Sequence, residues 1–244
     1  MNKKMEQTPQ QFFFSGARHT IPLLISSAPF GFIFGALAEP SGLSPIGALL
    51  MSIFVYAGAS QFIALGLLAV GSPLLVIVLT TFIVNLRHIL YAASLKEAIK
   101  DLSITWRTLL AFGLTDETYA ALVSRFGQSF KHPQLHWFYL GSYLAMYLNW
   151  IAWTLVGIIV GQQIKNIEQW GLDFAIVVTF IGIVMPLLQS KPFVLTALCA
   201  AGLSLATFHW PYSLGLLFSV VCSIALGFAW AKMSKSSQGK KGLE

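Results

Sequence analysis

The amino-acid sequence predicts an all-α fold, a bundle of six to eight membrane segments in a lipid bilayer. Apolar residues make up 56% of the chain and charged residues only 10%, whereas roughly 25% of the residues in soluble domains are charged. The mean hydropathy is +0.73. The apolar residues also form continuous runs, as spanning helices require, and not the short alternating stretches of a spanning β-barrel.

The apolar runs follow one another closely along the chain. A helix that crosses the hydrocarbon core needs about 20 mostly apolar residues. Short stretches with proline and glycine separate several runs, and both residues interrupt helices. We predict membrane segments at residues 21–38, 46–70, 73–94, 108–124, 137–163, 172–189, 193–209 and 212–231.

Basic residues gather at the two ends of the chain, which has a net charge of +6. Lysine and arginine are enriched on the cytoplasmic side of membrane proteins. We therefore expect residues 1–20 and 232–244 to be cytoplasmic tails, and residues 21–231 to form one membrane domain in the cytoplasmic membrane. Because these charges flank apolar runs and form no stripe along a soluble face, they predict contact with lipid and not with nucleic acid.

Two topologies place both tails in the cytoplasm, because each contains an even number of membrane crossings. Eight full crossings place the basic residues 95–107 outside, against the positive-inside preference. Six full crossings place them inside if segments 46–70 and 108–124 are broken or re-entrant. Gly58, among small residues, and the acids Asp116 and Glu117 offer interruptions at these places. Non-helical backbone at membrane depth is tolerated where it lines a protein cavity.

The third apolar run ends with a polar cluster that includes Asn85, Arg87 and His88. An arginine near mid-membrane costs ~2.5–3.5 kcal/mol on insertion scales, so it requires a partner. A guanidinium group can hold a carboxylate by two parallel hydrogen bonds. Arg87 therefore binds a substrate carboxylate, forms a gating ion pair or extends to the interface. We select Asn85 and Arg87 as ligand-binding candidates and His88 as a coupling candidate.

Two adjacent acids, Asp116 and Glu117, interrupt the fourth run, with Tyr119 close behind. Successive helical residues point ~100° apart, so both acids cannot face one site equally. One acid would bind a proton or an ammonium group while the other pairs with Arg87. A carboxyl group in low-dielectric surroundings holds its proton more readily, as a proton carrier must. The alternative is that this stretch is a cytoplasmic loop.

Small and polar residues form a third group, with Pro29 and Phe30 in the first run and Gly58, Ser60 and Gln61 in the second. Small residues let membrane helices approach closely. They also permit unwinding, which frees backbone groups to bind a ligand. We select these five residues as further ligand-binding candidates, with close packing as the alternative.

The motifs of common enzymes and cofactor sites are absent from the sequence. It contains no zinc signature, phosphate-binding loop, nucleophile elbow or dinucleotide motif. Cys199 and Cys222 lie in apolar runs, where cysteine acts as a small hydrophobe. We therefore predict no metal, no cofactor and no enzymatic activity.

Taken together in this order, these clusters resemble those of the AzlC family, the large subunit of bacterial branched-chain amino acid exporters. The resemblance covers nearly the whole membrane part, about residues 22–230. It implies export of valine, leucine or isoleucine, with methionine for some members, and a small membrane partner of the AzlD family. The residues that carry it are Pro29, Phe30, Gly31, Ala57 to Phe62, Asn85 to His88, Tyr91, Asp116, Glu117, Tyr119 and Ala120.

The physical interpretation agrees with export of a neutral aliphatic amino acid. A zwitterion needs groups of both signs, and Arg87 with Asp116 and Glu117 would supply them. Without a nucleotide motif, the energy would come from an ion or substrate gradient. We expect proton coupling through one of the two acids, with sodium as the alternative. Two other classes remain open, an intramembrane enzyme using Asp116, Glu117 and His88 in acid–base roles, and a non-transporting scaffold for the small subunit.

Overall fold

The computed structural model describes residues 8–127, 132–163, 191–210 and 214–241, with residues 130, 181, 185 and 188. All regular secondary structure in these residues is helical, which confirms the predicted all-α class. The helices are α1 (Pro9–His19), α2 (Ile21–Ala38), α3 (Pro45–Phe54), α4 (Gly58–Ala69), α5 (Leu74–Asn85), α6 (Arg87–Ile99), α7 (Ile104–Phe112), α8 (Asp116–Phe126), α9 (Leu135–Gln163), α11 (Lys191–Ala206) and α12 (Leu214–Lys241).

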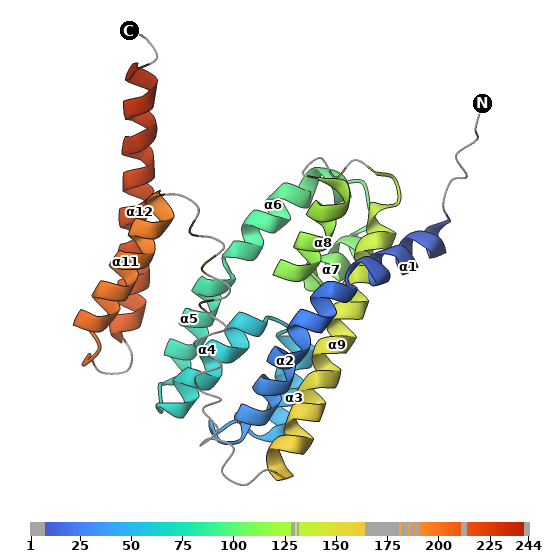
Figure 1. The fold of residues 1–244 in the computed structure, drawn as a ribbon, viewed down its shortest axis with the longest axis horizontal. Helices are drawn as coiled ribbons and strands as arrows, with labels where there is room; N and C mark the ends of the chain where they lie inside the picture. The colour runs from blue at the N-terminus through green and yellow to red at the C-terminus, as the bar shows by residue number, and fades with distance from the viewer. Residues whose placement is uncertain are drawn as a thin grey trace. The chain divides into compact units, whose positions relative to one another are not determined.

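The chain divides into two compact units. The first comprises residues 1–65 and 81–172, and the second comprises residues 66–80 and 173–244. In the first unit, α1 and α2 both pack along the long helix α9 (Figure 1). In the second unit, α11 and α12 lie side by side as a helical pair (Figure 1).

The contact between α2 and α9 is close because glycines lie at the crossing. A Cβ atom at Gly35 would overlap the carbonyl oxygen of Thr154, and one at Gly157 would overlap that of Phe32. Small residues let helix backbones approach where no hydrophobic effect drives association. Small residues therefore serve for close packing at Gly35, one helical turn after Gly31, as the packing alternative predicted.

Among the residues that the structure describes, three helical stretches are long and apolar enough to cross a membrane: Ile21–Ala38, Leu74–Ile99 and Leu135–Gln163. The second joins α5 and α6 through a single turn residue, Leu86. These stretches match the predicted segments 21–38, 73–94 and 137–163. Segment 172–189 lies almost entirely outside the described residues.

Both predicted interruptions are present. Segment 46–70 breaks between α3 and α4 at residues 55–57, where Tyr56 has a φ of +41°. Segment 108–124 breaks between α7 and α8 at residues 113–115. Whether these broken segments dip into the membrane and return stays a prediction.

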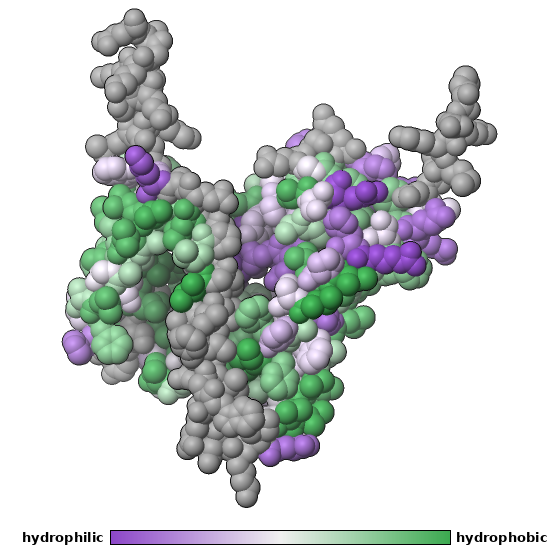
Figure 2. Space-filling view, viewed as in Figure 1, coloured by the Kyte–Doolittle hydropathy of each residue, from purple (hydrophilic) through white to green (hydrophobic). Residues whose placement is uncertain are grey.

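The predicted N-terminal tail contains a helix that the apolar pattern alone did not indicate. Thr8 and Gln11 form a capping box at the start of α1, with Pro9 in the first helical position. Figure 2 shows hydrophilic residues gathered over the part of the first unit formed by α1, α7 and α8. At the other end, α12 continues as a helix into the predicted C-terminal tail.

Candidate functional site

The two helix breaks meet inside the first unit. The ring of Tyr56, in the α3/α4 break, stacks on Phe112, the last residue of α7, with centroids 6.2 Å apart. Tyr56 also contacts Tyr147 of α9 edge to face at 4.9 Å. A bulky residue with positive φ is strained and persists only where its surroundings hold it. The aromatic contacts around Tyr56 supply that restraint.

Arg87 and Asp116 form an ion pair beside these breaks. Arg87 Nη2 lies 2.8 Å from Asp116 Oδ2, and the two side chains are 23% and 38% exposed. The other oxygen, Oδ1, accepts a hydrogen bond from the Tyr91 hydroxyl at 2.6 Å. Among the predicted roles of Arg87, this geometry matches the ion pair and not extension to the interface. Its Nε atom is buried and has no hydrogen-bond partner among the described residues.

Asp116 and Glu117 form the first turn of α8 and not an irregular loop, whereas the cytoplasmic position of this stretch stays a prediction. Thr115 and Thr118 form a capping box at this helix start, and carboxylates there are stabilised by the helix dipole. Glu117 is half-buried, and Arg87 pairs with Asp116 and not with Glu117. The two acids therefore share one helix end but have different neighbours.

The other coupling candidates, Tyr119 and His88, lie on the same side of this cluster. The Tyr119 ring stacks on Tyr91 with centroids 4.5 Å apart, and its hydroxyl accepts a hydrogen bond from Ser94 at 3.0 Å. The His88 ring lies 6.0 Å from the Tyr91 ring. Tyr91 thus connects Asp116, Tyr119 and His88.

Three ligand-binding candidates belong to a second polar network. Ser60 donates a hydrogen bond to Asn85 Oδ1 at 2.8 Å, which joins the start of α4 to the end of α5. Gln61 Nε2 donates to Ser52 Oγ at 3.0 Å, and Ser52 lies 3.0 Å from the hydroxyl oxygen of Thr154 on α9. Ser60 and Gln61 are fully buried.

Gly58 lies under an aromatic ring. A Cβ atom placed on Gly58 would lie 2.9 Å from Cη2 of Trp150. The absence of a side chain at Gly58 therefore lets α9 cover the start of α4. Gly58, Ser60 and Gln61 all fall in the first turn of this helix.

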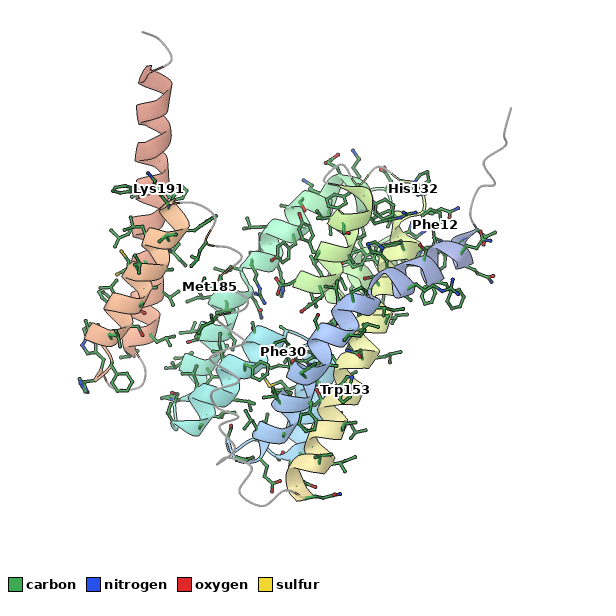
Figure 3. All side chains as sticks on the ribbon, in the orientation of Figure 1. Phe12, Phe30, His132, Trp153, Met185 and Lys191 are labelled. Atoms are coloured by element: carbon green, nitrogen blue, oxygen red, sulfur yellow. The ribbon has the colours of Figure 1, made fainter. Side chains whose placement is uncertain are left out.

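The candidates on α2 are not joined to these networks. Pro29 lies inside α2 and is exposed, and Phe30 is half-buried. No hydrogen bond or ring contact in the described residues connects either one to Arg87 or Gln61. Figure 3 labels Phe30 on α2 and Trp153 on α9, where the Trp153 Cβ atom packs against Gly31.

One face of α9 was missed by the sequence analysis, which selected no residue of segment 137–163. Tyr143, Tyr147, Trp150 and Thr154 recur at spacings of four, three and four, so they share one helix face. This face contacts Tyr56, Gly58 and Ser52 in turn. The spacing of residues with polar atoms in an otherwise apolar helix was the available signal.

No metal centre is found in the part of the chain that the structure describes. Within it, no three histidine, cysteine, aspartate or glutamate side chains come together. Cys199 and Cys222 are free and partly exposed.

Comparison with known proteins identifies the family of this chain. The AzlC protein family matches residues 22–164, more than half of the chain. The chain belongs to the AzlC family. The match includes both helix breaks, the ion pair and the α9 face described above.

Relatives of this AzlC chain come from several bacteria. The inner membrane protein YgaZ of Escherichia coli is 28% identical over 86% of this chain and 87% of its own length. A membrane protein of Helicobacter pylori is 34% identical over 86% of this chain and 83% of its own length. The branched-chain amino acid transport protein AzlC of Bacillus subtilis is 29% identical over 80% of this chain and 75% of its own length. No solved structure matches the chain.

Family membership supports two general conclusions. The chain is a membrane protein, and its family is associated with branched-chain amino acid transport. The sequence resemblance to AzlC is thereby confirmed.

Proposed function

We propose that this chain is the large subunit of a secondary exporter of neutral aliphatic amino acids such as valine, with methionine as a further candidate. It would act in the cytoplasmic membrane with both termini inside. The observation that carries the proposal is the ion pair between Arg87 and Asp116, next to a second acid, where two helix breaks meet. Family membership supports the substrate class.

A charged side chain inside an apolar helical bundle costs free energy. Intramembrane ionisable residues commonly mark substrate or ion pathways. Arg87 and Asp116 neutralise one another while paired, which suits a gate that is closed in the absence of substrate. Broken helices are the usual means by which transporters present backbone groups to a ligand.

Coupling to proton entry fits the unequal neighbours of the two acids. Asp116 is bound by a guanidinium and a phenol hydroxyl. Glu117 forms no salt bridge among the described residues and is half-buried. We assign proton binding to Glu117 in preference to Asp116, with sodium coupling as the alternative to be tested.

The proposed complex includes a small AzlD-type membrane subunit, as the family resemblance implies. Irregular backbone at membrane depth must be shielded from lipid. Residues 56–57 and 113–115 of the two breaks are buried within this chain, whereas Phe54 and Val55 beside the first break are exposed, and a second subunit would cover them. A purified large subunit that transports at full rate alone would contradict this part of the proposal.

The decisive experiment measures flux in proteoliposomes. The chain is reconstituted with and without the small subunit and supplied with labelled valine, leucine, isoleucine or methionine under an imposed pH gradient. We expect flux that responds to the gradient, and no flux of a charged amino acid such as lysine. Absence of flux for all four neutral substrates in the assembled complex would refute the proposal.

A further inference from the structure

The two helix ends at the α3/α4 break differ in their hydrogen-bond partners. On the carbonyl side, Ile53 accepts a hydrogen bond from the Tyr147 hydroxyl at 2.9 Å. Met51 accepts from the backbone N–H groups of Val55 and Tyr56. The free carbonyl end of α3 therefore has partners from both the backbone and α9.

The amide side of the same break has no equivalent cap. The first N–H groups of a helix have no partner within the helix. Gln61 N donates to Ala57 O, so the N–H groups of Gly58, Ala59 and Ser60 come before the first helical hydrogen bond. Ala57 precedes the helix and its methyl side chain has no acceptor atom. The positive end of the α4 dipole is thus left without an acidic or hydroxyl cap at Ala57.

A buried donor belongs to the ring that covers this helix end. Trp150 is only 7% exposed, and its Nε1 atom has no hydrogen-bond acceptor among the described residues. Its Cη2, Cζ2 and Cζ3 atoms lie 2.9, 3.2 and 3.5 Å from the position of a Cβ atom on Gly58. The indole ring that carries this N–H is therefore in contact with the first residue of α4.

A buried acceptor lies one turn along the same helix. Gln61 is fully buried, its Nε2 atom binds Ser52, and its Oε1 atom has no partner among the described residues. Gln61 and Gly58 are three residues apart and share a face, and helical side chains lean toward the N-terminus. Buried polar groups without partners are unfavourable and are normally satisfied by protein, water or ligand.

We propose that the start of α4 binds the main-chain groups of the amino-acid substrate. The carboxylate accepts hydrogen bonds from the N–H groups of Gly58 to Ser60 and from Trp150 Nε1, and the ammonium donates to Gln61 Oε1. This inference rests on the proposed function and assigns Arg87 to the gate with Asp116, not to the substrate carboxylate. The ligand class is an α-amino acid with both main-chain groups free.

The first test observes Trp150 directly in the full-length protein. Tryptophan indole nitrogens are labelled with ¹⁵N, the protein is placed in lipid nanodiscs, and the Trp150 signal is assigned from its loss in Trp150→Phe. We expect L-valine to shift this signal and valinamide, which lacks the carboxylate, to leave it in place. An unmoved signal at saturating valine, or an equal shift with valinamide, overturns the inference.

The second test measures transport. Trp150→Phe keeps an aromatic ring and removes the N–H donor, so the KM for valine should rise about tenfold, as expected for a hydrogen bond to a charged group. Trp153→Phe, one turn away on the same helix, is the matched control and should keep KM within about twofold of wild type. Equal KM values for the two variants overturn the inference.

The failure of this inference is distinguishable from failure of the proposed function. Wild-type valine flux is measured first, and its absence refutes both statements. Flux with no carboxylate-dependent shift at Trp150 refutes the binding site alone. If Trp150→Phe does not fold, the signal is assigned from its loss in Trp150→Tyr, and the shift itself is still observed in the wild-type protein.

Discussion

The Arg87–Asp116 pair gives a prediction whose size can be estimated from the structure. The two side chains are 23% and 38% exposed and lie 2.8 Å apart. Breaking a buried pair by removing one partner costs ~3–5 kcal/mol, whereas exposed pairs contribute ~0–1 kcal/mol. After a discount for this partial exposure, we expect Arg87→Gln or Asp116→Asn to destabilise the protein by about 1–3 kcal/mol.

The assay is a double-mutant cycle on thermal unfolding. For a chain of this length, each kcal/mol corresponds to roughly 2–4 °C in Tm. The combined Arg87→Gln and Asp116→Asn variant should be more stable than the sum of the single changes predicts, because neither charge is left without a partner. We expect a coupling energy of about 1–2 kcal/mol between the two positions.

The matched control is the exposed pair of Glu97 on α6 and Lys100 directly after this helix, which lie 2.7 Å apart. Glu97→Gln with Lys100→Gln should show no measurable coupling, because solvent screens the pair. Additive effects at Arg87 and Asp116, within about 0.5 kcal/mol, would refute the estimate. In flux assays each single variant should lose most transport; unchanged flux in an assembled Arg87→Gln complex would instead favour the scaffold alternative.

Three further predictions concern the acids, the glycines and Tyr56. Glu117→Gln should abolish the response of valine flux to an imposed pH gradient, whereas the control Glu97→Gln should retain this response. If both Glu117→Gln and Asp116→Asn respond to the gradient as the wild type does, proton coupling through either acid is excluded. Gly35→Ala should destabilise the protein by about 1–3 kcal/mol in thermal unfolding because its Cβ overlaps Thr154, whereas Gly66→Ala, with open space around it, should be neutral or stabilising. Tyr56→Phe removes a buried hydroxyl without a partner among the described residues, so Tm should stay level or rise, and a large loss of stability would show that this hydroxyl is hydrogen-bonded.

Features that depend on local sequence were predictable here. Gly58 among small residues and the acids at 116 and 117 indicated both helix breaks, because such residues disfavour a continuous apolar helix. The need of Arg87 for a charge partner indicated pairing with one of the two acids, and the structure shows that this acid is Asp116. These predictions required only the cost of polar groups in lipid.

Contacts between distant helices were not predictable in the same way. Tyr91 binds Asp116 across 25 residues, and Ser52 lies against Thr154 across 102. The sequence does not identify either partner, because a hydroxyl on an apolar helix can equally bond to its own backbone. The roles of Tyr56 and Trp150 likewise emerge only once α9 is placed over the α3/α4 break.

The two breaks differ in a way that bears on mechanism. At the α7/α8 break, Thr115 caps the helix and two acids occupy its first turn, so negative charge already meets the positive helix end. At the α3/α4 break, Ala57 provides no cap and the adjacent buried side chains contribute an unpaired donor and acceptor. A bound anion would do for α4 what the carboxylates of Asp116 and Glu117 do for α8. Under the proposed function, substrate and proton therefore occupy neighbouring helix ends, and the ring contact between Tyr56 and Phe112 joins the two breaks through a single strained residue.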